Sequence, residues 1–154
     1  MVNLGAGYEM SPRISAGRRR YGRSMDLSAP PRLLLQGPPR IGKSTVIARL
    51  AGDLHAADVR FAGFLTRELL VADHRVGFAV RDFAGAEAVI AHRDFATPVS
   101  VGRYGVDVPA FERVALPALA RAASPDVDVV LVDEVARMEL ASVAFVEALH
   151  HILA

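Results

Sequence analysis

A run of residues suited to binding phosphate lies between positions 37 and 45, where Gly37 is followed at fixed spacing by Gly42, Lys43 and Ser44. The pattern G-x-x-x-x-G-K-[ST] is that of a phosphate-binding loop, whose backbone N–H groups and following helix start both face an anion. In such loops the lysine reaches the β- and γ-phosphates, and the hydroxyl binds Mg²⁺. We therefore predict a nucleotide-binding loop made of Gly37, Pro38, Pro39, Arg40, Ile41, Gly42, Lys43, Ser44 and Thr45.

Lys43 is the only lysine among the 18 Lys and Arg residues of the chain. Every other cation is arginine, which indicates a composition that favours arginine wherever either residue would serve. A compact ammonium and a broad, planar guanidinium are not interchangeable at a phosphate loop. The lysine at this position therefore supports the phosphate-binding interpretation.

Arg40 stands inside the loop, at a position where many such loops carry glycine. The backbone there often takes a positive φ, which costs a non-glycine residue about 1 kcal/mol or more. Two roles stay open for the side chain. Either it lies beside the β,γ-bridge as an additional cation, or it points to solvent and weakens the loop, and we favour the second.

The loop needs a strand before it and a helix after it, and the sequence predicts both. Residues 33–35 form an apolar run expected to be a buried strand, and residues 44–54 carry apolar side chains at helical spacing. A second apolar strand at 127–132 ends in Asp133 and Glu134. A strand that is buried on both faces and presents a carboxylate at its C-terminal edge is the Walker B pattern.

Short strands separated by turn residues fill the region between these motifs. Residues 59–68, 76–80 and 86–91 read as strands, with a turn at 72–74, and residues 102–108 add a short strand or turn. Such a series predicts an antiparallel meander, which would extend one edge of a parallel sheet or fold over the nucleotide.

Two helices are predicted in the second half of the chain. The first runs over 109–123, with Pro109 at its first position and Pro117 as an expected kink or break. The second runs over 140–153. The predicted fold class is therefore α/β, with a mostly parallel sheet flanked by helices and an antiparallel β meander.

Composition excludes several classes of protein. The chain is 52% hydrophobic and 23% charged, and it contains no run of about 18 apolar residues that would span a membrane. The absence of cysteine removes disulfides, thiolate nucleophiles and cysteine-based zinc sites, and a reducing cytoplasm is the natural location.

The basic residues are unevenly distributed. Residues 1–24 hold five arginines and a single acidic residue, Glu9, so the rest of the chain is mildly acidic and argues against nucleic-acid binding. We expect 1–24 to be a disordered basic segment before a domain at 25–154. A weak transit-like segment, or an upstream extension if translation begins at Met25, are the alternatives.

Four stretches give the chain a resemblance to a known family. They are residues 63–66 (G-F-L-T), 75–78 (R-V-G-F), 104–108 (Y-G-V-D-V) and 133–140 (D-E-V-A-R-M-E-L). With the loop, they resemble the small P-loop nucleoside-triphosphatase family that includes the cancer-related nucleoside-triphosphatase. The resemblance covers positions 33 to 145, and the D-E-x-[GA]-[KR]-M-E stretch is its most specific part. Members continue past the final helix, so it also implies that a C-terminal segment is missing here.

The resemblance implies a RecA-like α/β sheet and the Mg²⁺-dependent hydrolysis of nucleoside 5′-triphosphates to diphosphates, with loose base preference. Ser44 and Asp133 would hold Mg²⁺, Asp133 through water, and Lys43 would hold the phosphates. Glu134 is the candidate for orienting or deprotonating the attacking water.

Arg137 would lie near the same edge, where it could stabilise charge on the γ-phosphoryl group. A surface salt bridge is the equally plausible role for this side chain. We assign Glu139 to structure, as a group that fixes Arg137.

Two rival functions stay open. One is a nucleotide-dependent small-molecule kinase of similar fold, and the other is a nucleotide-binding remnant without catalysis. A GTPase switch is disfavoured because guanine selection by the motif N-K-x-D needs an adjacent asparagine and lysine. The single lysine of the chain is Lys43 and its single asparagine is Asn3, so the motif is absent. The oligomeric state is left open.

Overall fold

The computed structural model describes residues 32–154, so the predicted basic segment at 1–24 lies outside the described residues. The elements are α1 (Lys43–Ala56), β1 (Phe61–Val71), β2 (His74–Asp82), β3 (Glu87–His92), β4 (Val99–Val101), β5 (Tyr104–Val106), α2 (Val108–Ala122), β6 (Val129–Asp133), the 3₁₀ turn η1 (Glu139–Ala141) and α3 (Val143–Leu153). Within residues 32–154, none of these helices is long and apolar enough to cross a membrane.

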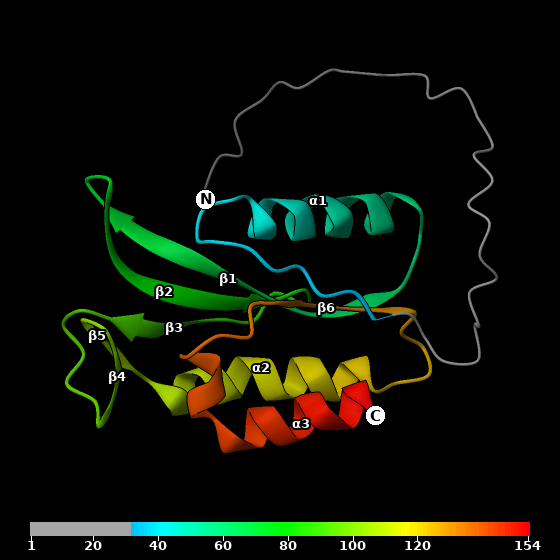
Figure 1. Ribbon diagram of the computed structural model, residues 1–154. Helices are drawn as coiled ribbons and strands as arrows, with labels where there is room; N and C mark the ends of the chain where they lie inside the picture. The colour runs from blue at the N-terminus through cyan, green and yellow to red at the C-terminus, as the bar shows by residue number, and fades with distance from the viewer. Residues whose placement is uncertain (1–31) are drawn as a thin grey trace. The chain divides into compact units, whose positions relative to one another are not determined.

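The strands form one six-stranded sheet in the order β4-β5-β3-β2-β1-β6 (Figure 1). Only the β1–β6 pair is parallel, and the other pairs are antiparallel. The expectation of a mostly parallel sheet is therefore wrong for the described residues, because the meander supplies most of the sheet. Its first turn is tight, with positive φ at both Ala72 (46°) and Asp73 (63°), as a two-residue hairpin loop requires.

Residues 33–35 do not form the buried strand that we expected. Leu33 and Leu34 are 93% and 88% exposed. An apolar run becomes a strand only when another strand satisfies its backbone groups, and no described strand pairs with this one. The predicted strand elements at β1, β2, β3, β5 and β6 are confirmed.

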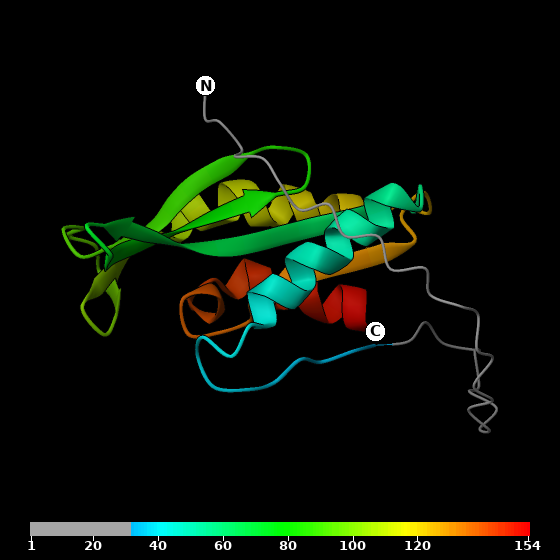
Figure 2. The same ribbon diagram turned by 90° about the horizontal axis from the view of Figure 1, so that it is seen from above.

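Helices cover both faces of the sheet, with α1 on one face and α2 and α3 on the other (Figures 1 and 2). The main core lies under α2 and α3, where the rings of Phe64, Phe111 and Phe145 pack with centroids 5.1–5.9 Å apart. On the other face, α1 buries only Ala51. The layer formed by α1, which follows the loop, is therefore less firmly packed than the layer formed by α2 and α3.

Helix α2 begins as the sequence predicts but does not break. The Asp107 carboxylate caps it by accepting the Ala110 N–H at 2.9 Å, and Pro109 lies in the first turn. Pro117 falls inside the helix, so of the predicted kink or break, the break is wrong. Ala118 and Leu119 next to it are fully buried, and their packing offsets the hydrogen bond that proline cannot make.

Helix α3 begins at Val143, three residues later than predicted, because Ser142 caps it. The Ser142 hydroxyl accepts the Phe145 N–H at 3.0 Å and donates to a Glu112 carboxylate oxygen at 2.7 Å. The preceding residues form η1 instead. The cap therefore fixes the 134–141 connection against α2.

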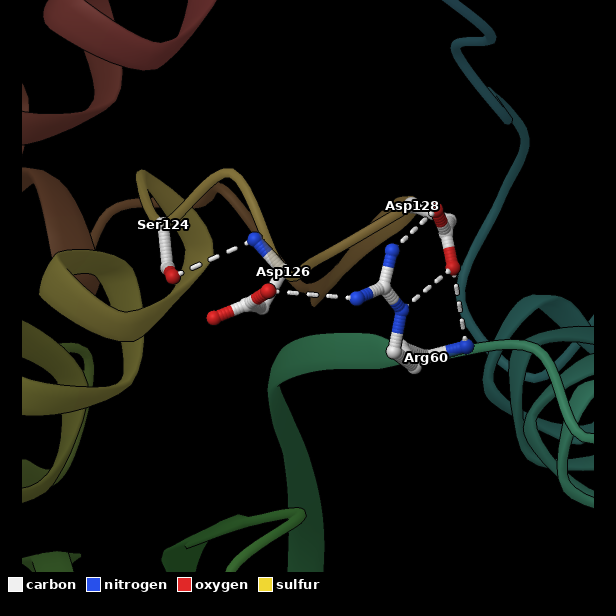
Figure 3. A network of polar contacts seen from close by, with 4 residues as sticks. All are labelled: Arg60, Ser124, Asp126 and Asp128. Atoms are coloured by element: carbon white, nitrogen blue, oxygen red, sulfur yellow. Dashed lines mark hydrogen bonds and ion pairs between the residues drawn. The ribbon is translucent and has the colours of Figure 1, made fainter.

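Two features join β1 to β6. Gly63 has φ 120°, and a Cβ on it would lie 1.9 Å from the Leu131 carbonyl oxygen, so only glycine lets the strands approach this closely. At the N-terminal ends of both strands, the Arg60 guanidinium donates to Asp128 at 3.0 and 3.1 Å and to Asp126 at 3.3 Å (Figure 3). This cluster closes the end of the strand pair that lies away from the loop.

Candidate functional site

The loop at 37–45 folds around two residues with positive φ. Arg40 has φ 63°, as expected for that position, and Gly42 has φ 103° and caps the start of α1. The Lys43 ammonium donates to the carbonyl oxygens of Gly37 at 3.1 Å and Pro38 at 3.2 Å. The lysine is therefore held over its own loop, where it can turn to a bound anion.

Asp133 lies at the end of β6 and faces this loop. It is 5% exposed, and its Oδ2 is buried with no hydrogen-bond partner. Burial raises the pKa of Asp133, while the Ser44 hydroxyl and the positive charge of Lys43 oppose that rise. The structure thus brings Asp133, Ser44 and Lys43 together, as the two motifs predict.

The orphaned Oδ2 of Asp133 beside the Ser44 hydroxyl is a fitting donor set for a divalent cation, which prefers hard oxygen ligands. Among residues 32–154, no group of three or more His, Asp or Glu side chains could hold a metal alone. A cation here would therefore be shared with the phosphates of a ligand, as Mg²⁺ usually is.

Two more carboxylates follow β6. Glu134 is exposed, whereas Glu139 is only 2% exposed and its Oε2 accepts the Ala136 N–H at 3.1 Å. Burial raises the pKa of Glu139 to about 7, and the nearby Glu134 and Asp133 carboxylates add to that rise. Glu139 therefore holds the turn after β6, but no hydrogen bond links it to Arg137 within the described part of the chain.

A cleft of about 680 Å³ joins the loop to the β1–β2 hairpin across the end of β6. Both ribbon views place the free end of the hairpin on the same side as the start of α1 (Figures 1 and 2). The cleft is lined by Gly37, Pro39, Arg40, Lys43 and Ser44 of the loop, by Asp133, Glu134, Val135 and Ala136, by the 33–36 segment, and by Thr66, Arg67, Glu68, Arg75 and Phe78 of the hairpin. Arg40 is exposed within it.

A smaller cavity of about 210 Å³ adjoins the cleft and shares Thr66, Phe78, Glu134 and Ala136 with it. Arg137 and Glu139 line this smaller cavity and not the cleft itself. Arg137 is exposed, and no ion pair joins it to another residue between 32 and 154. Its alternative role as a surface salt bridge thus finds no partner among these residues.

The structure brings most of the predicted residues to one place. Pro38, Ile41, Gly42 and Thr45 belong to the loop but do not line the cleft. Sequence reasoning did not assign a role to the hairpin residues Thr66, Glu68, Arg75 and Phe78, although two of the stretches that carry the resemblance include three of them. The sequence signal that could have identified this wall was a pair of opposite charges, Glu68 and Arg75, on either side of the turn predicted at 72–74.

Comparison with known proteins is consistent with this geometry. The sequence profile of the NTPase family matches residues 32–154. A nucleoside-triphosphatase THEP1 of Korarchaeum cryptofilum is 39% identical over 122 residues, which cover 79% of this chain and 62% of that protein. The chain therefore spans less than two thirds of the length of this relative.

Two solved structures are also similar. The crystal structure of THEP1 from Aquifex aeolicus superposes with a TM-score of 0.67 at 30% identity, covering 76% of this chain and 66% of that one. The solution structure of a human cancer-related nucleoside triphosphatase gives a TM-score of 0.65 at 34% identity, with the same coverage.

Proposed function

The chain belongs to the NTPase family, and on that premise we propose that it hydrolyses nucleoside 5′-triphosphates to diphosphate and phosphate in the presence of Mg²⁺. The observation that carries this proposal is the buried, unpartnered Asp133 oxygen facing Ser44 and Lys43 at the mouth of the loop. A polyphosphate and its cation would satisfy all three side chains together.

In the proposed reaction the loop amides and Lys43 bind the β- and γ-phosphates. Ser44 and Asp133 would hold Mg²⁺, which, when bound, neutralises phosphate charge and polarises the phosphoryl oxygens. Glu134, exposed at the cleft and one residue beyond Asp133, orients a water molecule and takes its proton as the water oxygen bonds to the γ-phosphorus. The bond between the γ-phosphorus and the bridging oxygen breaks, and the diphosphate leaves.

Arg137 would act from the smaller cavity. It and Glu134 line that cavity together, and within residues 32–154 its guanidinium is not taken by an ion pair. This supports a role in stabilising charge on the transferring phosphoryl group. The segment at 33–35 lines the cleft with exposed leucine side chains, which carry no hydrogen-bonding groups that would select one base, and this supports loose base preference.

The test is phosphate release from ATP, GTP, CTP and UTP with Mg²⁺ and no added acceptor. We expect Lys43→Ala to lower kcat/KM about 100-fold or more, because it removes the cation on the phosphates. Glu134→Gln should lower kcat by a similar factor while nucleotide still binds. Arg49→Ala is the matched control, because Arg49 is an exposed cation on the same helix that lines neither cavity.

Release that is lost in both variants and kept in the control would support the assignment. A folded wild-type chain that binds nucleotide without releasing phosphate would overturn the hydrolase proposal. Transfer to an added small molecule would then indicate a kinase, and binding alone would indicate a remnant.

A further inference from the structure

The Arg75 guanidinium is held in place on the hairpin wall of the cleft. Its Nε donates to the Tyr104 hydroxyl at 3.2 Å, and an Nη1 hydrogen is donated to Glu68 Oε1 at 2.5 Å. Its central carbon lies 5.1 Å from the centre of the Phe78 ring, a cation–π distance. Three groups from β1, β2 and β5 therefore fix one cation.

The fixed guanidinium still has donors to offer. Arginine carries five N–H hydrogens, and the contacts to Tyr104 and Glu68 use two of them. The Arg75 side chain is 30% exposed, and it lines the same cleft as Lys43 and Ser44. Arg75 is therefore ordered before any ligand arrives and keeps a set of donors for a ligand in the cleft.

The charges around the cleft indicate which ligand group those donors would meet. A triphosphate bound by the loop would bring its terminal group near the end of β6, where Asp133 and Glu134 line the cleft and would repel it. From the loop side, Lys43 and the cation proposed on Ser44 and Asp133 would compensate for this charge. On the hairpin side, Arg67 pairs with Glu87 and its side chain is 55% exposed. Arg75 is held by three groups and is 30% exposed, so it is the more firmly positioned cation on that wall.

We propose that Arg75 binds the terminal phosphoryl group of the nucleotide, with Glu68 and Tyr104 as positioning residues. This inference rests on the proposed function, because it needs a triphosphate seated in the loop. An arginine fixed in this way matches phosphate oxygens with little loss of side-chain freedom. A diphosphate lacks the group that Arg75 contacts, so the residue would select triphosphates over diphosphates.

The test measures binding without turnover. Titration calorimetry with Mg²⁺ compares ADP and the non-hydrolysable β,γ-imido analogue of ATP on the wild-type chain and on Arg75→Ala. Loss of a charge-assisted contact should weaken the analogue about 10- to 100-fold and leave ADP affinity within about twofold. Arg81→Ala is the control, because Arg81 is exposed on the same strand and lines neither cavity.

Arg75→Lys keeps the charge but cannot hold both Tyr104 and Glu68, so we expect an intermediate loss confined to the analogue. This variant also carries the test if Arg75→Ala does not fold. Equal weakening of ADP and analogue, or no change in either, would overturn the inference and assign Arg75 to structure. The calorimetry measures binding and does not depend on turnover. A wild-type chain that fails to hydrolyse ATP would therefore refute the proposed function, while the role of Arg75 would still be decided by the affinities for ADP and the analogue.

Discussion

The two ends of the parallel β1–β6 pair carry similar acidic residues in opposite electrostatic situations. At the N-terminal end, the Arg60 guanidinium lowers the pKa of Asp128 by direct hydrogen bonds, and Asp126 completes the cluster (Figure 3). At the C-terminal end, burial raises the pKa of both Asp133 and Glu139. One end pairs its charges within the protein, and the other keeps the buried Asp133 Oδ2 without a hydrogen-bond partner.

The difference separates structural from functional acidic residues within one pair of strands. Asp128 is exposed and fully engaged by Arg60, so nothing at that end calls for another partner. Asp133 is buried with a free oxygen beside Ser44. Burying a charge without a partner is costly, so a protein keeps such a group where function needs it.

The largest effect is expected from Asp133→Asn, which tests whether the aspartate at the C-terminal end of β6 is functional. Phosphate release should fall about 100-fold or more, because the neutral amide no longer holds the divalent cation. Without Mg²⁺, the variant should melt at the same temperature as the wild type or higher, because a buried charge has been removed. A fall in both activity and melting temperature would instead indicate that Asp133 supports the fold.

A smaller effect is expected at Glu139. Its pKa is about 7 in the fold and 4.5 ordinarily, so the folded state holds the proton more tightly. The contribution of Glu139 to stability should therefore be greatest below pH 4.5 and be lost as the pH rises through 7, by about 3 kcal/mol in all. Denaturant unfolding across pH 4 to 8 measures this.

Glu139→Gln should flatten that decline, because glutamine can still accept the Ala136 N–H and has no proton to lose. Glu147→Gln, at an exposed site on α3, is the control that should keep the wild-type pH dependence. An unchanged slope in Glu139→Gln would show that another group is responsible.

The smallest effect is expected at the satisfied end. Asp128→Asn removes an exposed ion pair, and such pairs contribute little because solvent screens them. Activity should stay within about twofold of the wild type, and melting should shift slightly downward, less so at high salt. A large loss of activity would mean that the Arg60 cluster at one end of the β1–β6 pair affects the site at the other end, and would contradict a purely structural role for Asp128.

Much of the fold could be predicted because local signals agreed with the tertiary contacts. The helix after the loop, the hairpin strands and the start of α2 near Pro109 follow from periodicity and side-chain chemistry. The predictions that failed depended on partners. Residues 33–35 lack a strand to pair with, and Pro117 is tolerated because its neighbours are buried.

The residues of the candidate site likewise divide into those that local sequence predicts and those that depend on distant partners. Lys43, Ser44, Asp133 and Glu134 came from two short motifs, because a phosphate loop and a strand end have fixed local spacing. Arg75 came only from the fold. Its partners Glu68 and Tyr104 are 7 and 29 residues away along the chain, and sequence spacing does not state such contacts.

By itself, the sequence determined the phosphate loop, the carboxylates after β6 and the alternating strands, since each is specified by neighbours within a few positions. Only the tertiary structure decided that the sheet is largely antiparallel and that Arg75 faces the loop across a cleft. It also decided that equivalent aspartates at the two ends of β6 have opposite pKa shifts. The physical reason is that strand pairing, burial and charge compensation depend on which distant residues the fold brings together.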